Sequence, residues 1–355
     1  MAREDDVTVL TGATGFVGSL VLERLLARGD RVAALVRARD DADARRRLEQ
    51  LAEATWGDAT VVAGVQVLAA DVERDGLGLA PDAYDALAER AAAVVHCAAS
   101  IRFDLSLDDA HAINVAGTER IVALAERARE RGAAGRLVHV STAYVHGRAD
   151  GLARETGPAP TPAFRNTYEK TKHRAERVVE RLDGAAIVRP SIVVGDTRTG
   201  WTSSFNVVYP PLRALVSGVL DVVPAPAGAI LDLVPVDHVV EVVAGLLDDP
   251  AQTGVVQVVS GELAPTMEQF ARLSLEHAGR PMMECVPTAA DQIGVYAPYV
   301  DVWARFEFAR AGQLGVRPVP IERLVPLLLD HAAAARWGRT RVLRSSPVGA
   351  ASAAA

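Results

Sequence analysis

The chain has 355 residues, half of them hydrophobic, and carries a formal net charge of −7 at pH 7. This length suits one large α/β domain with an elaborated second region. The negative charge argues against a nucleic-acid binder, and charges or prolines break every apolar run before the roughly 18 residues that a membrane span needs. The first residues, MAREDDVTVL, lack the features of a secretory signal, so we expect a cytoplasmic protein.

The cysteine content gives no sign of a disulfide scaffold or a metal site. The chain has two cysteines, Cys97 and Cys285, and no paired Cys/His spacing typical of structural zinc. We interpret both as buried apolar side chains rather than ligands or nucleophiles, and we expect no metal.

The chain begins with a strand, a glycine-rich turn and a helix, which together predict a phosphate-binding site. Residues 7–18 read VTVLTGATGFVG, and an apolar helical pattern follows. Such a turn aims backbone N–H groups and the positive end of the helix dipole at a pyrophosphate. Gly12 permits the sharp turn, Gly15 lets the phosphates approach, and Gly18 lets the helix pack closely on the strand.

The end of the second predicted strand, residues 31–36, indicates which dinucleotide binds. Sites for the unphosphorylated dinucleotide carry an acidic residue here, whereas this chain has Arg37 and four further arginines up to Arg47. A guanidinium can bind a 2′-phosphate with two hydrogen bonds. We therefore predict NADPH, with Arg37 first and Arg47 second as phosphate ligands. Some of these arginines are instead expected on the solvated face of a helix over residues 42–54.

Strand and helix patterns continue to alternate through the first half of the chain. Strands are predicted over residues 65–70, 93–97 and 136–141, with helices over 83–91 and 109–131. This alternation predicts an α/β fold with a Rossmann-type doubly wound parallel sheet. Its ligand crevice is expected at the C-terminal ends of the strands.

Several residues at these strand ends are candidates for the adenosine half of the cofactor. Asp71 and Val72 offer a carboxylate and a backbone N–H to the adenine, and the small side chains of Ala98 and Ala99 leave room for a ribose. Asn114, in the predicted helix that follows, is expected to support an active-site water or a backbone carbonyl.

A threonine, a tyrosine and a lysine form the predicted catalytic group. Thr142 follows the fifth strand, while Tyr168 and Lys172 are four residues apart in a predicted helix and therefore share one face. A nearby ammonium favours the phenolate of a tyrosine, whose ordinary pKa is about 10. Thr142 would hold a substrate oxygen beside Tyr168, the general acid for hydride transfer to a carbonyl.

With these motifs the chain resembles the extended short-chain dehydrogenase/reductase superfamily. The matching segments are TGATGFVG (11–18), HCAAS (96–100), NVAGT (114–118), VSTAYVHG (140–147), YEKTK (168–172) and RPSIVVGD (189–196). Within the superfamily, LVRA, YEKTKHRAE and RPSIVVGDTRTGW look most like the fatty acyl reductase and thioester reductase branch. The resemblance covers about residues 6–260.

The resemblance implies NADPH-dependent reduction of an acyl thioester to an aldehyde, with the alcohol as a possible further product. It also implies that Thr142, Tyr168 and Lys172 are the catalytic residues and that Pro190, Ser191 and Ile192 line the nicotinamide. The complete expected cofactor site consists of Gly12, Thr14, Gly15, Phe16, Val17, Gly18, Arg37, Arg47, Asp71, Val72, Cys97, Ala98, Ala99, Asn114, Tyr168, Lys172, Pro190, Ser191 and Ile192.

The substrate itself is left open by these motifs. Thioester reductase domains often follow an adenylation and carrier module, which this sequence does not contain. The acyl group would then arrive as a coenzyme A ester or on a separate acyl carrier protein. Two alternatives stay open: an NADPH-dependent ketone or aldehyde reductase of the sterol or dihydroflavonol type, and an NADP sensor without catalytic activity.

The composition changes after residue 196, which predicts a smaller substrate-binding region. We expect an NADP-binding domain over residues 1–196, the substrate-binding region over 197–344 and a disordered tail over 345–355. A segment at about 231–260 is expected to return to the main fold and to begin a helix with Asp237 as its cap.

The aromatic residues and helical patterns of this second region allow two interpretations each. Trp201, Phe205 and Tyr209 either face an acyl chain or fill the core of the region. Helices predicted over residues 300–311 and 320–337 either close the substrate pocket or pack against a partner subunit. The oligomeric state is not predicted.

Overall fold

Seven parallel strands form the central sheet of this computed structural model, which describes residues 5–156 and 162–345. Their order is β10-β7-β5-β4-β1-β2-β3, and every pairing is parallel. This confirms the Rossmann-type doubly wound sheet. The strands are β1 (Val7–Thr11), β2 (Val32–Val36), β3 (Gln66–Ala69), β4 (Ala91–His96), β5 (Arg136–Val140), β7 (Ala186–Pro190) and β10 (Gly254–Val258).

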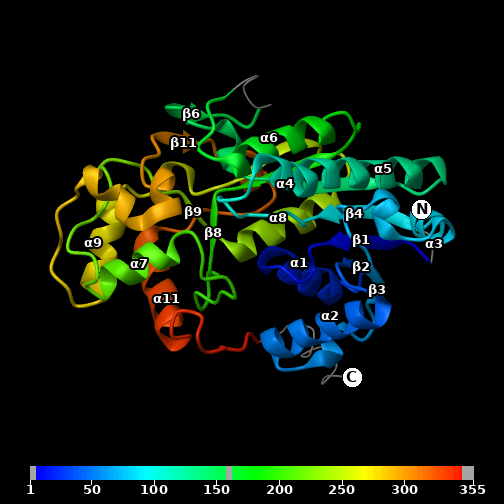
Figure 1. The fold of residues 1–355 in the computed structure, drawn as a ribbon, viewed down its shortest axis with the longest axis horizontal. Helices are drawn as coiled ribbons and strands as arrows, with labels where there is room; N and C mark the ends of the chain where they lie inside the picture. Colours follow the sequence, from blue (N-terminus) through cyan, green and yellow to red (C-terminus); the bar gives the residue numbers. More distant parts are fainter. Residues whose placement is uncertain (1–4, 157–161, 346–355) are drawn as a thin grey trace.

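Helices cover both faces of this sheet. One face carries α1 (Phe16–Ala27), α2 (Asp41–Trp56) and α8 (Val236–Asp248), which share one hydrophobic cluster with the strands. The other face carries α3 (Pro81–Ala88), α5 (Gly117–Glu130) and α6 (Thr167–Val179). Figure 1 shows α5 and α6 on one side of β1 and β4, and α1 and α2 on the other.

Local sequence explains where these elements begin and end. β2 reads VAALV and is buried at every residue, as expected for a strand covered on both faces. α2 begins after Asp40, whose side chain accepts a hydrogen bond from N of Asp43, and ends at Gly57 with φ of 71°. α6 begins after Asn166, whose side chain accepts a hydrogen bond from N of Glu169.

The helix predicted over residues 109–131 is interrupted in the structure. α4 (Leu107–His111) leads into a π-helical turn over Ala112–Ala116, and α5 follows. Such turns are rare and concentrate at functional sites. This one carries Asn114 next to the predicted crevice.

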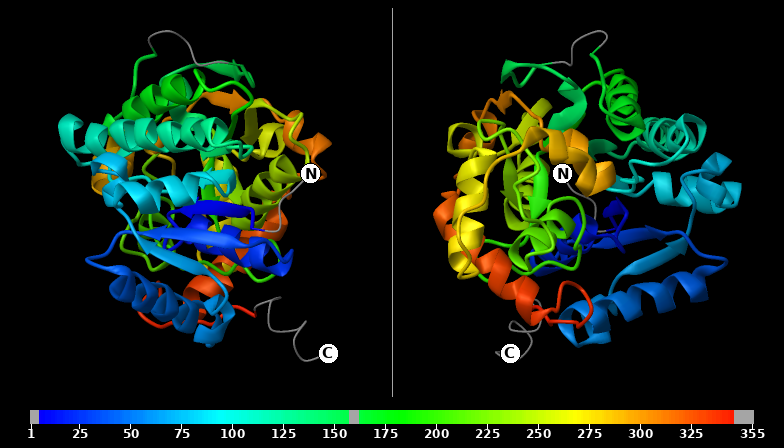
Figure 2. Two further views of the ribbon diagram at one scale, coloured as in Figure 1. Left: turned by 90° about the vertical axis from the view of Figure 1, so that its right-hand side faces the viewer. Right: turned by 60° about the vertical axis from the view of Figure 1, so that its left-hand side comes forward.

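The chain after residue 196 builds a second hydrophobic cluster. It contains α7 (Tyr209–Val216), α9 (Met267–His277), the 3-10 segment Pro287–Tyr299 and α11 (Ile321–Ala334). Figure 1 and the right-hand view of Figure 2 show α7, α9 and α11 gathered on the far side of the molecule from α2 and α3. Within the described ranges, no helix combines the length and the apolar character that crossing a membrane requires.

Two short strand pairs connect this second cluster with the sheet. β6 (Gly151–Ala153) pairs with β11 (Ala304–Phe306), and β8 (Ile192–Val194) pairs with β9 (Leu233–Pro235), both in parallel. From β9 the chain enters α8 and then β10, which lies beside β7 at the edge of the sheet. Residues 233–258 therefore return to the main fold.

Two predictions for the second region are wrong. Residues 300–311 do not form one helix, because Ala304 and Phe306 alternate inward on strand β11 and only α10 (Arg310–Gln313) is helical. Asp237 does not cap α8. Its carboxylate instead accepts hydrogen bonds from N and Oγ1 of Thr197, and the helix begins directly after Pro235.

The chain leaves α11 and runs back to α2, as Figure 1 shows. N of Arg344 donates to O of Thr55 in α2 at 2.7 Å, and Nε1 of Trp201 donates to O of Val342 at 2.8 Å. The predicted helix over 320–337 is confirmed as α11. Beyond residue 345, the predicted tail lies outside the described residues.

Candidate active site

The turn between β1 and α1 leaves no room for side chains at two of its glycines. A Cβ atom on Gly12 would lie 2.7 Å from N of Ala98, and one on Gly18 would lie 2.0 Å from O of Gly12. Gly12 also has φ of +73°, which strongly favours glycine. Gly15 stands at the start of α1, where no side chain caps the helix. The backbone N–H groups of the first turn therefore face a cradle suited to a pyrophosphate.

A groove of about 1480 Å³ runs from this turn along the C-terminal ends of β1, β2 and β3. Its lining mixes glycines, small residues, arginines and two carboxylates, a composition that fits the adenosine and phosphates of a dinucleotide. The predicted cofactor residues that line it are Gly12, Thr14, Gly15, Arg37, Arg47, Asp71, Val72, Cys97, Ala98 and Ala99.

The arginines after β2 separate into two groups. Arg37 and Arg47 line the groove; the exposed guanidinium of Arg37 lies 3.3 Å from Glu73, and Arg47 donates to the backbone O of Arg37. By contrast, Arg45 donates to two backbone carbonyls after α2, and Arg46 pairs with a carboxylate of its own helix. Only the first group is placed to meet a phosphate in the groove.

A second cavity of about 1070 Å³ continues the groove toward the second region. Both cavities are lined by Gly12, Gly15, Cys97, Ala99 and Ile101, so they form one crevice. The predicted site residues that line the second cavity and not the groove are Phe16, Val17, Gly18, Thr142, Tyr168, Lys172, Pro190, Ser191 and Ile192.

Asn114 is the one predicted site residue that lines neither cavity. Its side chain is 1% exposed, and its Nδ2 donates to O of Ser100 at 3.1 Å and to Oγ1 of Thr171 at 3.0 Å. Its Oδ1 accepts from N of Ser100 at 2.8 Å. Asn114 thus supports a backbone carbonyl, one of its two predicted roles, and it reaches the crevice through Ser100.

Thr142, Tyr168 and Lys172 all line the second cavity. Burial raises the pKa of Tyr168 to about 12, while a hydrogen bond with Thr142 acts in the opposite direction. Nζ of Lys172 lies 2.7 Å from O of Val140 and 3.2 Å from Nε2 of His139. Burial lowers the pKa of Lys172 to about 8.

The expected effect of Lys172 on the tyrosine is not what the structure shows. The pKa of Tyr168 is raised rather than lowered, because the phenol is buried. The ammonium of Lys172 contacts O of Val140 and Nε2 of His139 in β5 instead. A phenol with a high pKa keeps its proton at neutral pH, as a general acid must. The geometry therefore fits a proton donor without a preformed phenolate.

Sequence reasoning missed the aromatic wall of the catalytic cavity, formed by Phe103, Tyr144 and Tyr299. The ring of Phe103 lies 5.8 Å from that of Tyr168 and 4.9 Å from that of Tyr299, which in turn lies 5.1 Å from Tyr144. These residues come from separate segments, so no local pattern connects them. His139 was missed as well, although a histidine inside the buried strand RLVHV is a visible signal.

Of the two interpretations of Trp201, Phe205 and Tyr209, the structure favours packing in the hydrophobic core over contact with an acyl chain. Trp201 is 3% exposed, and its ring lies 6.3 Å from that of Phe16. Phe205 stacks on His331 with ring centroids 6.0 Å apart. The hydroxyl of Tyr209 accepts a hydrogen bond from N of Gly195, the residue that follows β8. None of the three lines the cavities described for this crevice.

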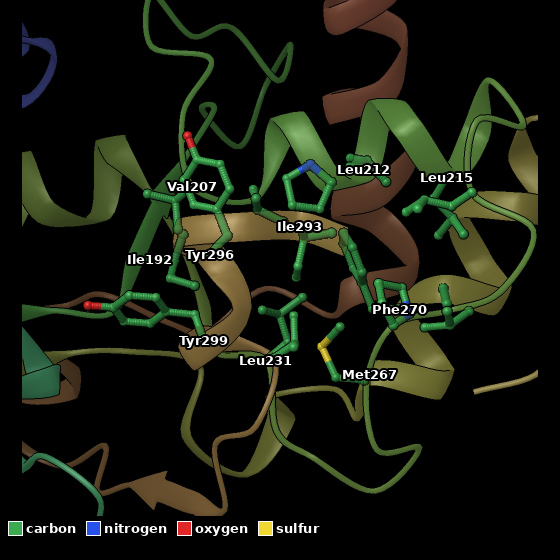
Figure 3. A pocket seen from close by; sticks show the side chains of 17 residues that line it. Ile192, Val207, Leu212, Leu215, Leu231, Met267, Phe270, Ile293, Tyr296 and Tyr299 are labelled. Carbon is green, nitrogen blue, oxygen red and sulfur yellow. The ribbon is translucent and has the colours of Figure 1, made fainter. Parts of the chain in front are cut away.

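An apolar pocket lies in the second region, next to the second cavity, which is the candidate catalytic cavity. Figure 3 shows Leu212 and Leu215 of α7 on one side, Met267 and Phe270 of α9 on another, and Tyr299 at one end. Of the described residues that line this pocket, none is charged. Across 5–156 and 162–345, no group of three or more His, Cys, Asp or Glu residues could hold a metal ion.

The chain matches a family model and a set of curated proteins. The NAD-binding family model described as "Male sterility protein" matches residues 10–243. "Fatty acyl-CoA reductase 1" of Gallus gallus is 31% identical over an alignment of 273 residues, and the match covers 65% of this chain and 52% of that protein. The chain thus spans about half the length of the curated relatives it matches.

Solved structures with the same fold include reductase domains. The terminal R domain from the myxalamid PKS-NRPS biosynthetic pathway has a TM-score of 0.81 and 22% identity, covering 94% of this chain and 91% of that one. A thiolation-reductase di-domain from an archaeal non-ribosomal peptide synthetase has a TM-score of 0.72 and 17% identity, covering 94% of this chain and 76% of that one.

Proposed function

This chain belongs to the NAD-binding family described as "Male sterility protein", and on that premise we propose that it is an NADPH-dependent reductase of acyl thioesters. The observation that carries the proposal is the position of Tyr168, which lines a cavity between a dinucleotide groove and a wholly apolar pocket. The name of the Gallus gallus relative supports a fatty acyl-coenzyme A substrate. The thiolation-reductase neighbour supports a carrier-bound acyl group as the alternative form.

The crevice fits a nicotinamide dinucleotide. Gly12 and Gly18 have no space for a Cβ, so the backbone of the turn is open to the pyrophosphate. When bound, the dinucleotide supplies hydride chemistry. Arg37 and Arg47 support the phosphorylated form, because a guanidinium attracts a 2′-phosphate that a carboxylate would repel.

Each residue of the catalytic cavity has its own role in the proposed carbonyl reduction. Tyr168 keeps its proton at neutral pH and donates it to the carbonyl oxygen of the substrate. Thr142 hydrogen-bonds that phenol and orients it. Lys172, held by β5, lines the cavity and contributes a positive charge there. Phe103 and Tyr299 exclude water beside the reacting carbon.

The test is a substrate panel with the purified full chain. NADPH oxidation is followed with acyl-coenzyme A esters, acyl carrier protein esters, ketones and aldehydes, and a thiol reagent detects the released thiol. We expect thioesters to be reduced with release of one thiol for each aldehyde formed. Turnover of ketones alone would favour a carbonyl reductase, and NADPH binding without any turnover would favour a sensor; either outcome contradicts the proposal.

A further inference from the structure

Three side chains lie at the boundary between the catalytic cavity and the apolar pocket, and we call them the wall. Ile192, Val207 and Tyr299 are the described residues that line both spaces. They come from β8, from the segment before α7 and from the end of the 3-10 segment Pro287–Tyr299. Figure 3 shows all three at one end of the apolar pocket.

One member of this wall has a strained backbone. Val207 has φ of +50°, in the left-handed region that a β-branched residue rarely adopts. Such conformations are rare and concentrate at binding and switch sites. Val207 is thus held in the wall by its surroundings against its own preference.

Another member of the wall is tied to the catalytic helix. The Nδ2 atom of Asn166 donates to the hydroxyl of Tyr299 at 2.9 Å, and Tyr299 also hydrogen-bonds the buried carboxylate of Glu169. Asn166 caps α6, which carries Tyr168 in its first turn. Tyr299 is 4% exposed, so its ring is fixed between the second region and the catalytic residues.

The space behind the wall suits a hydrocarbon chain. Its lining is aliphatic and aromatic, with α7 and α9 on opposite sides (Figure 3). An unbranched acyl chain gains binding free energy for each methylene that it buries in such surroundings. The tyrosine hydroxyl of the wall is already hydrogen-bonded to α6, which leaves its ring to face the pocket.

We propose that Val207 and Tyr299 determine chain-length specificity by controlling the passage of the acyl chain from the catalytic cavity into the apolar pocket. This inference rests on the proposed function. A short acyl group is accommodated in the catalytic cavity alone, whereas a long one must pass the wall and fill the space between α7 and α9. Selectivity for long chains is therefore set by the wall and by the free volume behind it.

The first experiment reduces the free volume of the apolar pocket with a larger side chain on α9. Ala271 of α9 lines the pocket and is 1% exposed, while Ala332 of α11 belongs to the same hydrophobic cluster, is 0% exposed and does not line the pocket. We expect Ala271→Leu to lower the ratio of kcat/KM for hexadecanoyl-coenzyme A over butanoyl-coenzyme A by about tenfold or more. The matched Ala332→Leu variant should keep the wild-type ratio. Equal ratios in both variants would overturn the inference.

The second experiment changes the wall itself. Glycine adopts a positive φ without strain and lacks the two methyl groups, so Val207→Gly should widen the passage. We expect the ratio of kcat/KM for hexadecanoyl-coenzyme A over butanoyl-coenzyme A to rise about threefold or more in Val207→Gly. The melting temperature of this variant should stay at or above that of Ala332→Leu. An unchanged ratio in a folded Val207→Gly variant would overturn the role of the wall.

A binding measurement keeps this inference separate from the proposed function. The fluorescent fatty acid cis-parinarate is titrated into wild type, Ala271→Leu and Ala332→Leu. Binding about tenfold weaker in Ala271→Leu than in the other two supports the pocket, even if no thioester is reduced and the proposed function fails. Equal binding to all three proteins, or binding to none, would overturn the inference.

Discussion

The ammonium of Lys172 lies 3.2 Å from Nε2 of His139, so a residue of the catalytic helix is held by a neutral imidazole of β5. Burial, together with the charge of Lys172, lowers the pKa of His139 well below its ordinary value. The uncharged ring then accepts a hydrogen bond from Nζ, alongside O of Val140. These contacts position the ammonium of Lys172 beside the cavity, and burial lowers its pKa to about 8.

The pH dependence of the reaction should therefore report on Lys172. Its pKa is lowered to about 8, so the ammonium is charged below that pH and neutral above it, whereas Tyr168 with a pKa of about 12 stays protonated throughout. We expect kcat/KM to fall as pH rises through about 8. Lys172→Arg keeps its charge at high pH and should remove this decrease from the pH profile. A decrease at the same pH in that variant would contradict the assignment.

Replacing the proposed acid should affect chemistry rather than cofactor binding. Loss of a general acid costs about 10²–10⁴-fold in rate, and we expect Tyr168→Phe to lower kcat within that range. The dissociation constant of NADPH, measured by its fluorescence, should change little. Tyr144 lines the same cavity, so Tyr144→Phe is the matched control and should lose far less activity. Comparable rates for wild type and Tyr168→Phe would exclude the phenol as the proton donor.

The cofactor preference should depend on Arg37. A hydrogen bond to a charged group contributes about 1.5–3 kcal/mol, so Arg37→Asp should weaken NADPH by about tenfold or more relative to NADH. Arg39 is 80% exposed in its side chain, pairs with Asp43 and does not line the groove. Arg39→Asp is therefore the control for a general charge effect. Equal losses for the two dinucleotides in Arg37→Asp would contradict the choice of NADPH.

The positions of the glycine-rich turn and of Tyr168 and Lys172 beside one crevice could be predicted because each set belongs to a short local pattern. Gly12 and Gly18 follow a strand directly, and Lys172 lies one helical turn after Tyr168, so spacing alone places them on the correct face. The structure brings these patterns to one crevice because the strands are parallel and end at the same edge.

The aromatic lining of the catalytic cavity could not be predicted, because its residues become neighbours only through tertiary packing. Phe103 and Tyr299 are in contact across nearly two hundred residues of chain, and neither stands in a motif. Residues 300–311 have an apolar spacing compatible with a helix, but pairing of β11 with β6 overrides it. Asp237 has the chemistry of a helix cap, yet its carboxylate accepts hydrogen bonds from the amide and the hydroxyl of Thr197 instead.

The C-terminal segment should stabilise the fold through one cation that pairs with two buried carboxylates. Nε of Arg344 lies 3.2 Å from Glu23 of α1, its Nη1 hydrogen-bonds Asp196, and the guanidinium lies 5.5 Å from the ring of Trp201. Both carboxylates are nearly inaccessible to water, and removing one partner of a buried ion pair costs about 3–5 kcal/mol. We expect Arg344→Met to lower the free energy of unfolding in urea by that amount. Arg341, exposed in the same segment, is the control, and equal stability of Arg341→Met and Arg344→Met would show that the segment is not anchored by this contact.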